Sequence, residues 1–177
     1  ADSIFSGKRA MLDADIDHWT DRDQIDLRLK RVKEAGFNVY VPTVWQGRGT
    51  TWPSKYAQWD STVHAPSKDR FDPLAYVVTK AHEMGLEVHP WFTVVLRWYP
   101  DSYPDLALPD VFEGKLGAFD VHNLVFQQFI TNLIEEVATN YDVDGINLDY
   151  IRAMGLCKSK QCGQEYKLKY DRDLTMD

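Results

Sequence analysis

The octet GINLDYIR, residues 145–152, carries two polar side chains on alternate positions of a run that otherwise resembles a buried strand. Asn147 and Asp149 point to one face of such a strand, because side chains alternate along an extended chain. The aliphatic residues between and before them point to the other face. An unpaired carboxylate is costly to bury, so the polar face is expected to line a cavity in which Asp149 could do chemistry.

A second polar face occurs in the run VHPWFTVV, residues 88–95. His89, Trp91 and Thr93 share one side of it, and apolar residues alternate with them. A carboxylate surrounded by Trp, Tyr, His and Arg is typical of a carbohydrate site. Aromatic rings there stack on sugar rings, and carboxylates supply an acid, a base or a nucleophile.

Each of these residues also has a structural interpretation. Asp149 could be a structural carboxylate paired with Arg152 or Arg9. His89 could be a core histidine with its hydrogen bonds satisfied, and Trp91 could serve packing alone. A loop could simply be covered by Trp45, Trp52 and Trp59. A solvated acidic edge could consist of Asp13, Asp15 and Asp17.

Four strand-like runs alternate with helix-like runs and would position these side chains. The expected strands cover residues 9–13, 38–45, 87–95 and 145–151. Strict alternation of strand and helix predicts parallel strands joined by right-handed crossovers. The sequence therefore predicts an α/β sheet or barrel.

Three helices are marked by apolar residues at helical spacing, within residues 21–36, 72–85 and 123–140. Asp72 followed by Pro73 predicts an N-cap and a first-turn proline for the second helix. Asn123 can cap the third helix, and a glycine closes each of the first two.

The connections after the strands are long, whereas AGFN, MGLE and NYDVDG after the helices are short. In a (β/α)8 barrel, the loops after the strands build the active-site face. A doubly wound sheet is the alternative, but no Gly-rich phosphate turn follows the first strand. We therefore expect residues 1–177 to form one partial (β/α)8 TIM barrel domain, carrying about the first four βα units.

The chain of 177 residues is too short for a complete barrel, which needs about 250 residues. An open half-barrel would leave two bare strand edges and a wet apolar interior. We expect either a fragment of a longer chain, truncated at the C-terminus, or a half-barrel that self-associates through its open edges.

Composition limits the partners. A hydrophobic share of 44% suits one globular domain. A formal charge of −7 disfavours binding to nucleic acid or to an anionic membrane surface. No apolar run approaches the roughly 20 residues that span a bilayer. We expect a neutral substrate and no cofactor.

The two cysteines, Cys157 and Cys162 in LCKSKQCG, leave their redox state open. A disulfide fits an exported protein and free thiols fit a cytosolic one, and the four-residue gap permits closure without requiring it. Two cysteines without nearby histidines are too few for a tetrahedral zinc site, so no metal is expected. The histidines are scattered, at positions 18, 64, 82, 89 and 122.

Three stretches resemble the glycosyl hydrolase-like family 10 proteins, a bacterial group of TIM-barrel enzymes related to glycoside hydrolases. They are AGFNVYVPTVWQGRGTTWPSK, DPLAYVVTKAHEMGLEVHPWF and YDVDGINLDYIR, and the likeness extends over nearly the whole chain. The resemblance implies a complete (β/α)8 barrel and action on a polysaccharide or related glycan. It also implies a secreted, periplasmic or cell-surface location, with the cytoplasm as the alternative. It aligns the family's strand-one and strand-four Asp with Asp13 and Asp149, and its strand-three His and Trp with His89 and Trp91.

We therefore predict a glycoside hydrolase that uses Asp149 as one of two catalytic carboxylates, through an oxocarbenium-like transition state. Such barrels place another essential acid in strands five to eight, beyond this sequence, so the stereochemical outcome is left open. The predicted substrate-binding residues are Asp13, Trp45, Arg48, His89, Trp91, Asn147, Tyr150 and Arg152.

Three other functions stay open. A non-hydrolytic glycan-binding barrel would keep the aromatic contacts and use the carboxylates as hydrogen-bond acceptors. A metal-dependent hydrolase would need clustered histidines and carboxylates, yet the first strand lacks His-x-His. A self-complementing half-barrel would bind a partner through its exposed edges.

Overall fold

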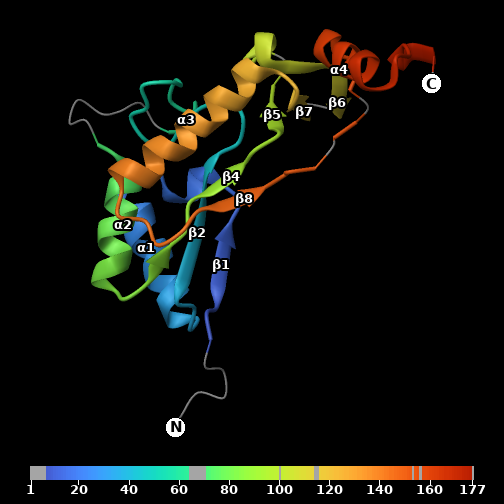
Figure 1. The fold of residues 1–177 in the computed structure, drawn as a ribbon. Helices are drawn as coiled ribbons and strands as arrows, with labels where there is room; N and C mark the ends of the chain where they lie inside the picture. Colours follow the sequence, from blue (N-terminus) through green and yellow to red (C-terminus); the bar gives the residue numbers. More distant parts are fainter. Residues whose placement is uncertain are drawn as a thin grey trace.

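The computed structural model of the chain describes residues 7–63, 71–99, 101–113, 116–152, 154–155 and 157–176. A curled parallel sheet lies at its centre, in the order β1-β2-β4-β8, with β3 beside β2 (Figure 1). This sequential order is that of half a (β/α)8 barrel, as predicted. The strands are β1 (Ala10–Asp13), β2 (Val39–Trp45), β3 (Glu87–Val88), β4 (Trp91–Thr93) and β8 (Asn147–Asp149).

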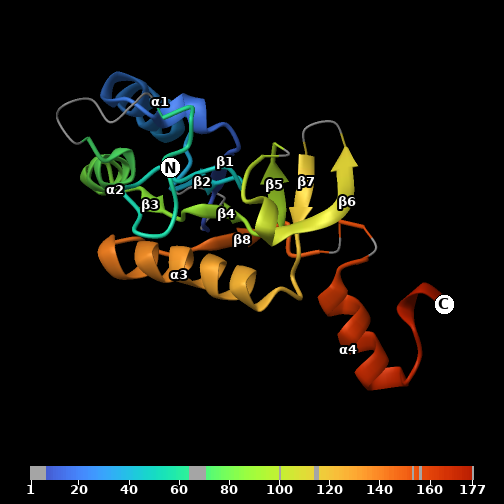
Figure 2. The same ribbon diagram turned by 90° about the horizontal axis from the view of Figure 1, so that it is seen from above.

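Three helices cover the convex side of this sheet. Seen from above, α1 (Arg22–Glu34), α2 (Pro73–Glu83) and α3 (Leu124–Asn140) form an arc outside the arc of strands (Figure 2). The Asp72 carboxylate accepts a hydrogen bond from the Ala75 amide at 3.0 Å, which confirms the predicted N-cap of α2. The predicted cap of α3 by Asn123 is confirmed in the same way. None of the helices in the described ranges is long and apolar enough to cross a membrane.

The hydrophobic core fills the space between the convex face and the helices. It joins side chains such as Tyr40 and Phe92 of the sheet to Leu29, Val77 and Leu133 of the three helices. Burial of this apolar surface fixes the strands in register and thereby positions the residues on the opposite face.

The sheet is open at both ends within the described part of the chain, where no strand pairs with the outer edge of β1 or of β8. Leu12, on the concave face of β1, is 57% exposed, and Leu148 on β8 is 46% exposed. Such exposure of large aliphatic side chains is what the predicted open half-barrel entails.

A second sheet was not predicted. It is antiparallel, in the order β5-β7-β6, and lies above the carboxyl ends of the parallel strands (Figure 1). Its own small core contains Val95, Leu108 and Ala118. The sequence prediction treated this region as a loop. The strands are β5 (Leu96–Trp98), β6 (Ala107–Glu113) and β7 (Leu116–Phe119).

A fourth helix, α4 (Lys160–Tyr170), follows the last parallel strand and was not among the predicted helices. It extends away from the sheet (Figure 2). The structure describes the whole of α4, and Cys162 is its one buried residue. Apolar packing therefore contributes little to the position of this helix. Three short 3-10 turns complete the fold: η1 (Ile16–Trp19), η2 (Pro104–Leu106) and η3 (Leu174–Met176).

Candidate functional site

The concave face of β4 and β8 carries the polar residues that the sequence pattern singled out. The register pairs Trp91 with Asn147 and Thr93 with Asp149. Paired and alternate residues of parallel strands share a face, so these four side chains point the same way. Asn147 and His89 line a shallow cavity of about 210 Å³ on this side. The structure thus brings Trp91, Asn147 and Asp149 together, as predicted.

Asp149 lies at the carboxyl end of β8 and is half-buried. Its Oδ1 accepts a hydrogen bond from the Tyr150 amide at 2.7 Å. Within the part of the chain that the structure describes, this amide is the one hydrogen-bond donor to the carboxylate, and neither Arg9 nor Arg152 forms an ion pair with it. Most lone pairs of this carboxylate are therefore available to a ligand on the concave face.

The backbone turns sharply at Tyr150, which has φ +51°. A left-handed conformation is uncommon for a residue with a bulky side chain, and such positions cluster at functional sites. The Tyr150 carbonyl accepts the Val95 amide at 3.2 Å. The guanidinium of Arg152 lies 5.4 Å from the Tyr150 ring centroid. These two predicted substrate residues therefore form the rim beside Asp149.

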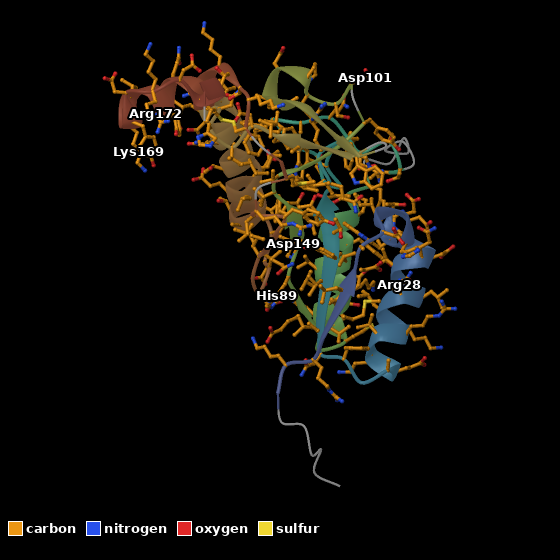
Figure 3. The ribbon with its side chains drawn as sticks, turned by 90° about the vertical axis from the view of Figure 1, so that its right-hand side faces the viewer. Arg28, His89, Asp101, Asp149, Lys169 and Arg172 are labelled. Atoms are coloured by element: carbon orange, nitrogen blue, oxygen red, sulfur yellow. A yellow bond between two sulfur atoms is a disulfide. The ribbon has the colours of Figure 1, made fainter. Side chains whose placement is uncertain are left out.

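His89 lies on the concave side but lower in the sheet than Asp149 (Figure 3). It lies four positions before Thr93, which pairs with Asp149. At about 3.3 Å per residue, that is a distance of about 13 Å along the strand. The imidazole Nε2 lies 3.0 Å from Glu87 Oε2. His89 is thus too far away to act directly on a bond at Asp149.

Asp13 lies on the convex side, with Met11, and is 4% exposed. Its Oδ2 accepts the Tyr40 hydroxyl at 2.9 Å and lies 3.2 Å from Arg28 Nε of α1. Its Oδ1 lies 3.0 Å from His18 Nδ1. Burial, and after it the charge of Asp13, raises the pKa of Tyr40 well above its ordinary value. The carboxylate predicted to bind substrate instead ties β1 to β2 and α1.

Trp45 was also predicted to contact sugar, but its side chain is fully buried. A register shift between Thr43 and Trp45 redirects it into the core. The ring centroids of Phe129 and Tyr103 lie 5.6 Å and 5.7 Å from that of its indole. Neither indole face is open to a ligand, so the structure gives Trp45 a packing role.

Arg48 lies in another place, a pocket of about 780 Å³ formed by the loops after β2 and β5. Its Nε donates to Asp60 Oδ2 at 2.7 Å, and its guanidinium carbon lies 5.5 Å from the Trp98 ring centroid. Asp101, which also lines the pocket, lies above and apart from Asp149 in Figure 3. The structure therefore does not bring Arg48 to the Asp149 site.

Four aromatic side chains line this upper pocket and were not predicted as site residues. Tyr99 and Tyr103 have φ values of +64° and +50°, and burial raises the pKa of Tyr103 to about 12. The density of aromatic residues in WPSKYAQW and RWYPDSYP is the signal that could have found the pocket. The four residues are Tyr56, Trp59, Tyr99 and Tyr103.

Candidate metal donors gather away from the concave face. Among the residues that the structure describes, one group of three or more such side chains occurs: His122, Cys157 and Cys162. Cys157 and Cys162 form a disulfide in this structure. His64 lies outside the described residues. The metal-dependent hydrolase alternative therefore gains no support around Asp149.

Comparison with known proteins gives both a family and a fold. The model of the family glycosyl hydrolase-like 10 matches residues 11–107. Glycosyl hydrolase YngK of Bacillus subtilis (strain 168) is 26% identical over 133 residues, which cover 68% of this chain and 26% of that protein. The chain thus spans about a quarter of the length of this curated relative.

Solved structures agree with the fold. A noncanonic maltogenic α-amylase, AmyB of Thermotoga neapolitana, has a TM-score of 0.54 at 16% identity over 92% of this chain and 42% of its own. An α-L-fucosidase of Bacteroides thetaiotaomicron has a TM-score of 0.52 at 26% identity, over 71% of this chain and 26% of its own. Partial coverage of both glycosidases is consistent with a partial (β/α)8 barrel.

Proposed function

Because the chain belongs to the glycosyl hydrolase-like 10 family, we propose that it hydrolyses glycosidic bonds in a polysaccharide or related glycan, with Asp149 as one catalytic carboxylate. The family match and the likeness to glycosidase structures support a glycan-related function. One observation carries the finer proposal. The Asp149 carboxylate ends a parallel strand on the concave face and accepts, among described residues, one backbone amide.

The surrounding residues have distinct tasks in this proposal. Asn147, two positions earlier on the same face, hydrogen-bonds a sugar hydroxyl, and the neighbouring Trp91 offers an apolar surface to the sugar. Tyr150 and Arg152 at the rim hold the part of the glycan that extends beyond the bond to be cleaved. Hydrogen bonds to the sugar that strengthen in the transition state would add to the rate.

Hydrolysis requires a second carboxyl group, at about 5–5.5 Å from the first for retention or about 6.5–9.5 Å for inversion. Two other carboxylates of the parallel strands are placed elsewhere. Asp13 faces α1, and Glu87 lies low in the sheet beside Lys8 and His89. Neither is positioned to complete a pair with Asp149.

The test is Asp149→Asn in the full protein, assayed by release of reducing ends from a panel of purified polysaccharides. Loss of a catalytic carboxylate is expected to lower kcat by about 10²- to 10⁴-fold. The matched control is Asp142→Asn, because the Asp142 side chain is 98% exposed. Activity of Asp149→Asn above a tenth of the wild-type value would remove Asp149 from the catalytic role.

A non-hydrolytic glycan-binding role is the second candidate, and one observation favours it. On the concave face, the Asp149 carboxylate and the Asn147 amide lie beside the Trp91 side chain, and such hydrogen-bonding groups next to an aromatic ring can bind a sugar without cleaving it. Equal glycan binding by the wild type and Asp149→Asn, with no turnover by either, would support binding without hydrolysis.

A further inference from the structure

A cluster of four potential metal donors joins two distant segments of the chain. Asp120 and His122 lie between β7 and α3, whereas Cys157 precedes α4 and Cys162 lies in its first turn. The donor atoms of His122 and the two cysteines lie within 4.8 Å of one another. Asp120 Oδ1 is 3.8 Å from Cys157 Sγ. The sequence argument found no histidine near the cysteines, and the fold brings one to them.

The chemistry of this donor set fits zinc. Two thiolates, one imidazole and one carboxylate are ligand types that Zn²⁺ takes in tetrahedral sites. The Asp120 carboxylate is already fixed, because its Oδ1 accepts the His122 amide at 3.0 Å. A pocket of about 950 Å³ includes His122 and both cysteines in its lining, which gives an ion and a reductant access to the cluster.

His122 also has the support that metal-binding histidines usually have. Its Nδ1 lies 2.5 Å from Glu165 Oε2 on α4. A carboxylate that accepts a hydrogen bond from one ring N–H orients the ring and raises the basicity of the other nitrogen. This contact is independent of the cysteines, and it links the same two segments.

The weak apolar packing of α4 indicates a structural role for the cluster. Cys162 is the buried residue of this fully described helix, and Leu168 is 89% exposed. An element with so little apolar contact needs a covalent or metal cross-link to stay in place. The His122–Glu165 contact and the approach of Cys157 to Asp120 supply the attachment in this structure, since the disulfide closes only a local loop at the start of α4.

We propose that Asp120, His122, Cys157 and Cys162 form a redox-gated zinc site that anchors α4 in its reduced state. A dithiol reductant gives two electrons and two protons to the Cys157–Cys162 bond and becomes a disulfide itself. The two resulting thiols release their protons as Zn²⁺ binds, since the metal requires thiolates. The disulfide form suits an oxidising compartment and the zinc form a reducing one. This proposal does not depend on the proposed hydrolase activity.

The test uses the full chain, reduced without oxygen by a phosphine and titrated with Zn²⁺ against a chromophoric chelator. One zinc ion per reduced chain is expected, with no binding by the oxidised chain. Co²⁺ in place of Zn²⁺ should show thiolate charge-transfer absorption. His122→Ala should weaken zinc binding at least tenfold, and Glu165→Gln by about tenfold. The control is His82→Ala, since His82 pairs with Asp144 away from the cluster.

Folding of each variant is checked on its oxidised form, in which the cysteines are paired and no metal is expected to bind. Zinc binding that His122→Ala leaves unchanged would overturn the proposal. Equal binding by the oxidised chain, or a cobalt complex without thiolate absorption, would also overturn it.

Discussion

The two faces of the parallel sheet hold their carboxylates in opposite ways. On the convex face, Asp13 is 4% exposed and its two oxygens contact Tyr40, His18 and Arg28. On the concave face, Asp149 is half-buried and accepts one backbone amide among the described residues. Both are aspartates at the carboxyl end of a strand. Free lone pairs, and not the residue type or its place in the strand, distinguish a candidate for chemistry from a structural cross-link.

The difference extends to the rest of each face. The convex face is covered by the helices and their core, and its buried carboxylates Asp13 and Glu136 are paired. The concave face leaves Leu12 exposed and Asn147 beside a cavity. We therefore expect substitutions on the convex side to change stability and those on the concave side to change activity.

The largest stability effect should come from Asp13→Asn. The change removes the charge that compensates Arg28 and places an amide against the Tyr40 hydroxyl and His18. Breaking a buried pair in this way should cost about 3 kcal/mol. Urea unfolding, followed by tryptophan fluorescence, measures the loss. Asp149→Asn is the comparison, with an expected change within about 0.5 kcal/mol. Equal losses of stability in both variants would contradict the proposed difference between the convex and concave faces.

Glu136 of α3 provides a second test of the convex side. It is 7% exposed and accepts the Trp52 indole N–H at 2.7 Å and the Lys55 amide at 2.9 Å. Glu136→Gln leaves one of these buried donors facing an amide NH₂, which should cost about 1–2 kcal/mol. Glu135→Gln, at an exposed position of the same helix, is the control. A loss as small as that of the control would show that this pairing contributes little.

Much of this architecture was predictable from the sequence because local chemistry determines it. The caps at Asp72 and Asn123, the apolar stripes and the alternation in β8 depend on residues close together in the chain. Their structures match the predictions within a few residues at each end. The same locality explains why Asn147 and Asp149 were correctly placed on one face.

The parts that the sequence did not reveal depend on distant contacts. A register shift after Thr43 turns Trp45 into the core, and no residue pattern marks that bulge. Asp13 faces the helices because Tyr40 and Arg28 meet it there. The antiparallel sheet and the donor cluster likewise join segments that are far apart in the chain.

Gly145 tests how tightly the lower part of the concave face is packed. A Cβ at this position would lie 2.8 Å from His89 Nδ1, so Gly145→Ala must displace the imidazole from its contact with Glu87. Overpacking of this kind should cost about 1 kcal/mol. Gly163→Ala in α4 is the matched control, because no atom lies within 4 Å of its added Cβ. It should be neutral or stabilising by up to about 1 kcal/mol. A Gly145→Ala variant with unchanged stability would indicate that the His89 side chain moves aside at little energetic cost.

The smallest effect concerns Asp144, in the connection from α3 to β8. Its Oδ2 contacts His82 Nε2 and the Val88 amide, each at 2.8 Å. Burial alone would raise the pKa of Asp144, but these two hydrogen bonds, together with the charges of His82 and His89, outweigh it and lower the pKa below its ordinary value. A carboxylate with a lowered folded-state pKa contributes stability above its unfolded pKa of about 3.9, and the contribution is lost as the pH falls through the folded value.

Asp144→Asn should therefore destabilise the protein at pH 7 by no more than about 0.5 kcal/mol, since the group is partly exposed to solvent. The difference from the wild type should shrink as the pH falls below about 4. Urea unfolding of both proteins across this range measures it, with Asp142→Asn as the control because that side chain is 98% exposed. A difference that stayed constant with pH would mean that Asp144 acts through its shape and hydrogen bonds. Its charge would then contribute nothing to stability, in contrast to the charge of Asp13 on the convex face.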